Sequence, residues 1–162
     1  MLNKDAKIVE NDAFSGIVSD ENLRMLVGYN MKRAFNAVQA DLLDALRPFE
    51  LRMITYSALV LIVDNPGLRQ SHLSSALAVE RPNLVVIIDQ LERRGLISRE
   101  RLASDRRAYG LHATLAGRKL YEDSVRAVTA HEVKIFGALD GALATNLVAD
   151  LRGIESRAKG NS

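Results

Sequence analysis

The stretch from residue 66 to residue 114 constrains the fold most, because its apolar residues change from a helical to an alternating period partway along. Two short helices are predicted first, at about Gln70–Leu77 and from Arg81 to about Arg94. Ser71 is a candidate cap for the first helix, and Pro82 suits the first turn of the second. Two short helices joined by a few residues are typical of a helix-turn-helix.

The second of these helices is predicted to have one buried face and one exposed face. Gly95 supplies its left-handed end, and Arg93 and Arg94 suit the negative end of the helix dipole. Apolar residues recur three and four positions apart, which marks the buried face: Leu84, Ile87, Ile88 and Leu91. The face expected to be exposed holds Arg81, Asn83, Val85, Val86 and Gln90.

Beyond Gly95 the alternating period predicts a β-hairpin. One strand begins at Leu96–Ser98, its partner holds Tyr109–Ala113, and the tip spans Arg101–Arg107. Ser104 is a turn former in that tip.

The hairpin and the helix before it concentrate positive charge. Six arginines and only two acidic residues occur from Arg93 to Arg107, although the whole chain has a formal net charge of only +2. A local excess of this kind is expected where a protein contacts phosphates. An ordinary solvent-exposed loop rich in arginine is the alternative.

Four longer helices are predicted around this stretch. Their apolar stripes place them at about residues 20–46, 50–64, 114–137 and from 140 onward. Asp20, Thr114 and Asp140 are the candidate caps. Residues 1–19 show little period and are expected to form a frayed tail.

Composition excludes several kinds of protein. The chain has no cysteine, which removes thiol chemistry, cysteine-liganded zinc and iron–sulfur clusters. None of the three histidines has metal-ligand spacing, and no phosphate-loop, hydrolase or metalloprotease motif occurs, so we expect no metal, no cofactor and no enzyme activity. No apolar run approaches the roughly 20 residues of a membrane helix, and the N-terminus does not resemble a signal peptide, so a cytoplasmic protein is expected.

Three segments together carry a family resemblance. LVVIIDQLERRGLI, then SDRRA, then the helix-opening TLAG, resemble the multiple-antibiotic-resistance regulator (MarR) family of winged-helix transcription factors. The upstream LRMITYSALVLI fits the same family, and the resemblance covers most of residues 20–157. It implies a mainly α fold with a small β-hairpin wing (α+β), a winged helix-turn-helix domain with a helical dimerisation region.

The chain is accordingly interpreted as a single domain over residues 1–162. Its DNA-binding part is expected at about 50–114 and its dimerisation part at about 15–47 and 115–160. The terminal helices carry apolar stripes that need covering, and members of the family dimerise through the first and last helices. The alternative is that these stripes pack within one chain.

Chemistry and resemblance together suggest the contacts to DNA. Asn83 suits adenine and Arg81 suits guanine or a phosphate, while Gln90 lies further along the same face. Members of the family usually have polar residues near Val85 and Val86, so these valines are expected to pack on thymine methyl groups, unless one of them is covered.

Further contacts are expected on either side of that helix. Arg106 and Arg107 are candidates for insertion into a groove, and Asp105 is expected to fix the wing tip by pairing with an arginine. Ser71 and His72, which open the first short helix, are candidates for phosphate contact. His72 is equally compatible with a plain surface role.

The resemblance also implies a cavity between the dimerisation helices and the DNA-binding part at about 50–114, called the reading head below. Aromatic and cationic side chains suited to a small anionic aromatic effector, an acid or a thioester, lie in the corresponding helices. The candidates are Tyr29, Arg33, Arg47, Arg52 and Tyr56. Each of them could equally belong to the core or the surface.

These features predict a ligand-responsive, homodimeric repressor that binds a palindromic operator in double-stranded DNA. Two other classes remain open. One is a winged-helix protein-interaction module without specific DNA binding, which the two exposed valines favour. The other is a small-molecule-binding enzyme, for which the sequence offers no set of catalytic residues.

Overall fold

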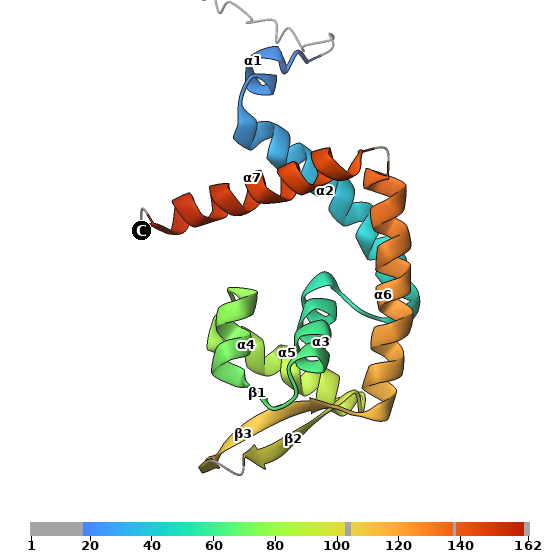
Figure 1. Ribbon diagram of the computed structural model, residues 1–162, viewed down its shortest axis with the longest axis vertical. Coiled ribbons are helices and arrows are strands. Elements are labelled where there is room, and N and C mark those ends of the chain that lie inside the picture. Colours follow the sequence, from blue (N-terminus) through green and yellow to red (C-terminus); the bar gives the residue numbers. More distant parts are fainter. Residues whose placement is uncertain (1–17, 103–104, 138, 161–162) are drawn as a thin grey trace, which may run out of the picture. The chain divides into compact units, whose positions relative to one another are not determined.

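The computed structural model describes residues 18–102, 105–137 and 139–160. The described chain is mainly helical with one small antiparallel sheet, which confirms the predicted fold class (Figure 1). It divides into two compact units, with the boundary between Phe35 and Asn36, inside helix α2. The predicted tail lies mostly outside the described residues.

The first unit holds helix α1 (Glu21–Arg24) and the beginning of α2 (Val27–Leu46). One continuous helix from residue 20 was predicted, and this is wrong, because the chain leaves the helix after Arg24. The amide of Asn30 donates to the carbonyl oxygens of Arg24 at 2.7 Å and Leu26 at 2.9 Å, which satisfies backbone groups at the break. Asp20 precedes α1 but makes no cap hydrogen bond there.

In the second unit, a single 3₁₀ turn, η1 (Arg47–Phe49), follows α2, and α3 (Met53–Asp64) begins later than predicted. Glu50 between them adopts a left-handed conformation with φ of 52°, which ends η1 and excludes this residue from α3. The hydroxyl of Thr55 accepts a hydrogen bond from the Arg52 amide at 2.9 Å and fixes the start of α3.

The two short helices were predicted correctly. Helix α4 spans Gln70–Leu77 and α5 spans Arg81–Arg93. Ala78 between them is left-handed, with φ of 51°, and turns the chain. The cap of α4 is Arg69 rather than Ser71, which lies inside the helix.

The sheet has the strand order β1-β3-β2 and holds β1 (Leu68–Arg69), β2 (Ile97–Leu102) and β3 (Asp105–Ala113). The hairpin of β2 and β3 confirms the predicted wing, although its strands reach further into the predicted tip. Strand β1 was not predicted. It pairs with the base of β3 and ties the start of α4 to the wing.

Helices α6 (Leu115–Phe136) and α7 (Gly141–Gly160) follow the wing, and both predicted caps are confirmed. The hydroxyl of Thr114 accepts from the Gly117 amide at 3.0 Å, and the carboxylate of Asp140 accepts from the Leu143 amide at 2.7 Å.

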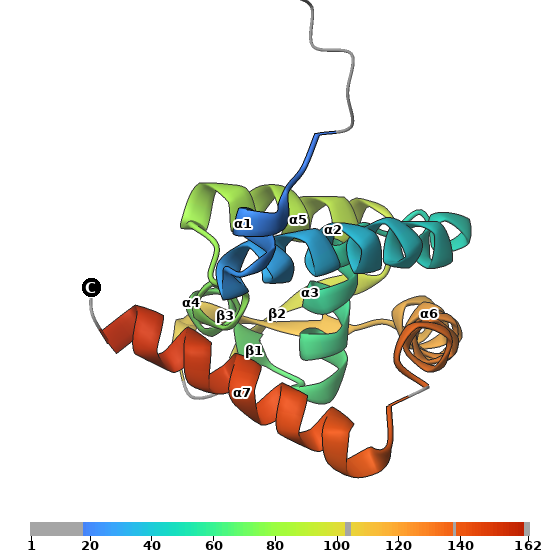
Figure 2. The ribbon, with the colours of Figure 1, turned by 90° about the horizontal axis from the view of Figure 1, so that it is seen from above.

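The core lies in the second unit and is centred on α3, which contacts α4, α5, α6 and β3. Figure 2 shows α3 between α4 and α6. The wholly buried apolar side chains include Leu46, Leu59, Ile62, Leu73, Ile88, Leu91 and Leu111. They come from α2, α3, α4, α5 and β3, so α5 is anchored by the same core as the elements around it.

Apolar side chains remain exposed on the helices at both ends of the chain. On α7 they recur along one stripe, which holds Leu143, Leu147, Val148 and Leu151. None of the described helices is long and apolar enough to cross a bilayer.

Candidate nucleic-acid interface

Helix α5 has the two faces that the sequence predicted. Leu84, Ile87, Ile88 and Leu91 are buried in the core. Val85 and Val86 are 45% and 63% exposed, so neither fills the core, and Arg81 and Asn83 are exposed beside them. Gln90 is half-buried. This face brings a cation, an amide and two apolar side chains together on one rigid helix.

The residues predicted to contact phosphate before α5 are also accessible. Ser71 and His72 are exposed in the first turn of α4. The Ser71 carbonyl accepts a hydrogen bond from the Ser75 hydroxyl at 3.1 Å. Neither side chain contributes to the buried core.

Arg94 at the end of α5 has a structural role. Its guanidinium donates to the carbonyl oxygens of Glu50 at 2.9 Å and Phe49 at 2.8 Å. These carbonyls end the 3₁₀ turn between α2 and α3, so Arg94 ties the reading helix to that junction. A planar fork of donors suits two neighbouring carbonyls. Arg94 is therefore not part of the predicted phosphate-binding charge.

Arg99 on β2 is likewise held within the protein. It pairs with Asp89 and, at 3.1 Å, with Glu92, both on α5. This bridge fixes the wing against the reading helix. Of the six arginines counted in the sequence, Arg94 thus binds backbone carbonyls and Arg99 binds carboxylates of the protein itself. The positive charge left to contact phosphates is therefore smaller than the number of arginines suggests.

Among the wing side chains that the structure describes, one arginine faces the solvent. Arg101 on β2 lies opposite Tyr109 on β3, and its Nε donates to the Tyr109 hydroxyl at 3.4 Å. Both are exposed, and the hydrogen bond raises the pKa of Arg101 further above its usual value. The sequence interpretation did not single out this pair. The positions of Arg101 and Tyr109 on either side of the predicted turn could have suggested it. The side chains of Asp105, Arg106 and Arg107 lie outside the described residues.

Three of the five candidate ligand residues lie in the second unit, and two lie in the first. Arg47 pairs with Asp44, Arg52 is exposed beside the start of α3, and Tyr56 is half-buried against the core. Burial raises the pKa of the Tyr56 hydroxyl. In the first unit, by contrast, Tyr29 and Arg33 do meet, with the Arg33 guanidinium 5.7 Å from the Tyr29 ring centre.

The second unit also has a hollow of about 360 Å³ between α2 and α6, with alanine side chains in its wall. His131 lies in that wall and is 3% exposed. Its Nδ1 lies 2.7 Å from the Asp41 carboxylate, which also pairs with Lys134. Its Nε2 is buried without a hydrogen-bond partner among the described residues, with the Glu132 carboxylate 4.0 Å away. None of the five candidate ligand residues lines this hollow.

The contacts of Asp41 should stabilise the packing of α2 against α6, and this stabilisation should depend on pH. Hydrogen bonds from Lys134 and His131 hold the pKa of Asp41 below 3.8, so its stabilising contribution is complete above that pH and is lost as the pH falls through the lower folded value. We expect Asp41→Asn to lower the melting temperature at pH 7, and the gap from the parent to close below about pH 4.

Thermal melts across this pH range measure that gap. The control is Asp123→Asn, which removes a carboxylate from an exposed pair with Arg126 on α6 and should cost less. A gap for Asp41→Asn that is absent at pH 7, or that persists unchanged to pH 2, would contradict the role given to Asp41.

A short helix with one face in the core and one free, a preceding short helix and an adjoining hairpin together define a winged helix-turn-helix, the class of fold that presents a helix to the major groove of DNA. Comparison with known proteins agrees with this. The model of the MarR family matches residues 51–109. The structure of the transcriptional repressor CouR bound to a 23-mer DNA duplex superposes with a TM-score of 0.81 at 33% identity, covering 86% of this chain and 99% of that one.

Two further relatives point the same way. CouR from Rhodococcus jostii RHA1 bound to p-coumaroyl-CoA has a TM-score of 0.77 and 29% identity, over 82% of this chain and 93% of that chain. A putative transcriptional regulatory protein for the hcr operon of Thauera aromatica is 47% identical over 62 residues, which is 38% of this chain and 37% of the relative. The chain belongs to the MarR family.

Proposed function

We propose that this protein is a homodimeric transcriptional repressor that binds an inverted-repeat operator and releases it when a small anionic effector binds. The exposed face of α5 carries the proposal, because Arg81, Asn83, Val85 and Val86 are free of the core while the helix itself is held rigidly. The likeness to a repressor bound to duplex DNA supports it.

In this proposal each reading helix enters a major groove. Asn83 and Arg81 supply the hydrogen bonds to base edges, and the valine methyl groups pack on thymine methyl groups. Ser71 and His72 contact phosphates at the start of α4. Gln90, being half-buried, contributes at the edge of this surface.

The wing contributes contacts beside the reading helix. Arg106 and Arg107 insert toward a groove, with Asp105 fixing the tip, and Arg101 adds a phosphate contact held in place by Tyr109. The DNA-binding part then spans about residues 50–114, and the helices at about 15–47 and 115–160 form the dimer. The exposed apolar stripe on α7 supports this division, because a partner would remove it from water.

Arg107→Ala tests the wing. Each phosphate contact that is lost should flatten the dependence of log affinity on log salt by about one unit, and weaken binding to all sequences similarly. Fluorescence anisotropy with labelled duplex from 50 to 300 mM salt measures the slope. The control is Arg126→Ala on α6, an exposed arginine paired with Asp123, which should keep the parent slope. An unchanged slope for Arg107→Ala would remove the wing from the interface.

The effector is proposed to be an aromatic acid or its coenzyme A thioester, because a CouR structure contains p-coumaroyl-CoA and this chain has cationic and aromatic side chains on its N-terminal helices. A gel-shift with the region upstream of the chain's own gene, repeated with a panel of aromatic acids and their thioesters, tests DNA binding and release together. Binding without release by any compound leaves a constitutive repressor. No binding at low salt favours a protein-interaction module, which the exposed Val85 and Val86 would also suit.

A further inference from the structure

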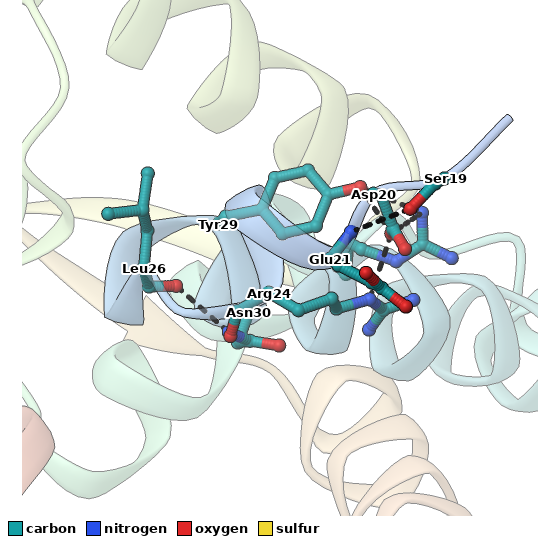
Figure 3. Close-up of polar contacts among 8 residues, drawn as sticks. Ser19, Asp20, Glu21, Arg24, Leu26, Tyr29 and Asn30 are labelled. Carbon is teal, nitrogen blue, oxygen red and sulfur yellow. Dashed lines mark hydrogen bonds and ion pairs between the residues drawn. The ribbon is translucent and has the colours of Figure 1, made fainter.

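The described part of the first unit contains a cluster built around the carboxylate of Asp20. Its Oδ2 accepts hydrogen bonds from the Tyr29 hydroxyl at 2.7 Å and from Nε of Arg24 at 2.8 Å, and Nη1 of Arg33 lies 3.8 Å away. Figure 3 shows Tyr29 directed at Asp20 from one side. One oxygen therefore accepts two hydrogen bonds and lies beside a third, cationic group, from residues spread over 14 positions of the sequence, from Asp20 to Arg33.

Tyr29 positions both cations. The guanidinium carbons of Arg24 and Arg33 each lie 5.7 Å from the centre of its ring, within the range of a cation–π contact. Nη1 of Arg33 also donates to the Tyr29 hydroxyl at 3.4 Å. The two arginines and the phenol hydroxyl thus converge as a set of donors, whose geometry depends on the ring as well as on the carboxylate.

The cluster is open to water and carries an excess of positive charge. The side chains of Arg24, Arg33 and Asp20 are 45%, 53% and 34% exposed. Two guanidinium groups face a single carboxylate, so the charge of the cations is only half compensated. The hydrogen bond from Tyr29, followed by the arginines, lowers the pKa of Asp20, so this carboxylate stays ionised to a lower pH than an ordinary aspartate.

We propose that Arg24, Tyr29 and Arg33 form a binding site for an oxyanion, a carboxylate or a phosphate group, and that Asp20 occupies this site from within the chain until a ligand replaces it. Bidentate donors beside an aromatic ring are well suited to either group. That the ligand is the effector rests on the proposed function. The occupied site would then be a built-in competitor, which sets the concentration of anion needed for a response.

Displacing Asp20 would also loosen α1. Asp20 directly precedes this four-residue helix, and α1 is otherwise joined to α2 through the Asn30 side chain, which spans the break at the Arg24 and Leu26 carbonyls. A ligand that takes over Arg24 removes one of the contacts that hold α1 in place. Anion binding is thereby linked to the conformation of the segment that leads into α2.

The test is a titration of the full chain, free of DNA, with pyrophosphate and separately with benzoate, followed by the Nε–H resonances of arginine side chains in NMR spectra. We expect Arg24 and Arg33 resonances to shift and saturate. Asp20→Asn, which removes the competing charge, should tighten binding about fivefold, the size expected for one exposed ion pair. Saturation by pyrophosphate alone assigns a phosphate group, and saturation by benzoate alone assigns a carboxylate.

The matched control is Glu21→Gln, which removes the same charge from the adjacent residue while leaving the Asp20 contacts intact. It should leave the affinity unchanged, whereas Arg33→Ala should weaken binding about fivefold. Equal tightening by both neutralised acids would show a general charge effect and overturn the proposal, as would the absence of any shift with either anion. Because no DNA is present, such a failure leaves operator binding by the same protein to be judged separately.

Discussion

Val86→Glu is expected to weaken binding to duplex DNA by on the order of 100-fold while leaving the fold intact. Val86 is 63% exposed on α5, so a longer side chain does not enter the core. In the complex the new carboxylate would lie in a groove lined by phosphates, twice in each dimer, where like charges repel strongly. Anisotropy with labelled duplex measures the affinity, and circular dichroism checks the helical content.

The control places the same change at Leu115, which is 86% exposed in the first turn of α6. A carboxylate suits the start of a helix, so Leu115→Glu should be stable and should bind DNA like the parent. Val86→Ala separates charge from methyl packing, because it should cost only a few-fold in affinity and only at sites with thymine. Parent affinity in Val86→Glu would mean that this face of α5 does not meet DNA.

Gly117→Ala is expected to lower the stability by on the order of 3 kcal/mol, because the added methyl group has no space. A Cβ at this position would lie 1.9 Å from the carbonyl oxygen of Leu96, a backbone atom that cannot move alone. That oxygen accepts a hydrogen bond from the Thr114 amide, and the Thr114 hydroxyl donates to the Gly95 carbonyl at 2.7 Å. The start of α6 is therefore clamped to the end of α5 at this point.

A thermal melt measures the effect, which should amount to a fall of roughly 6–12 °C for a chain of this length. Gly28→Ala is the matched control: Gly28 also lies in a helix, but nothing is within 4 Å of its added Cβ. There alanine should be neutral or should stabilise by up to about 1 kcal/mol, through its better helix propensity. If the two variants melt alike, the close approach of α6 to Leu96 is not part of the fold.

The reading head could be predicted from sequence because its signals are local. The three- and four-residue spacing in α5, the proline in its first turn and Gly95 beyond its end all concern neighbours along the chain. The same holds for the caps Thr114 and Asp140, each of which binds an amide three residues on. Local patterns of this kind survive folding because the core does not oppose them.

Features that depend on distant partners were missed. Strand β1 has only two residues, and its existence depends on pairing with Leu111 and Gly110 on β3. At the break after Arg24, the Asn30 side chain binds the carbonyls of Arg24 and Leu26. Neither follows from a periodic pattern, and the apolar stripe through α1 and α2 continues across the break, so a single helix was predicted.

The charges of the candidate site show the same division. A count of arginines from 93 to 107 cannot distinguish a guanidinium that faces solvent from one that binds within the protein. Arg94 binds two carbonyls of the α2–α3 junction and Arg99 binds two carboxylates of α5. Among the ligand candidates, Tyr29 and Arg33 are in contact in the structure. Their carboxylate partner Asp20 was predicted only as a helix cap.

Selection from a random pool of duplex DNA tests the central claim most directly, namely that two copies of this chain present α5 to successive major grooves, with the wings beside them. Duplexes retained by the purified protein are sequenced after several rounds. The predicted result is an inverted repeat whose half-site centres lie about 10 base pairs apart, one turn of the double helix. Enrichment of a single unrepeated site, or of no sequence at all, would contradict a two-fold dimer that reads an operator.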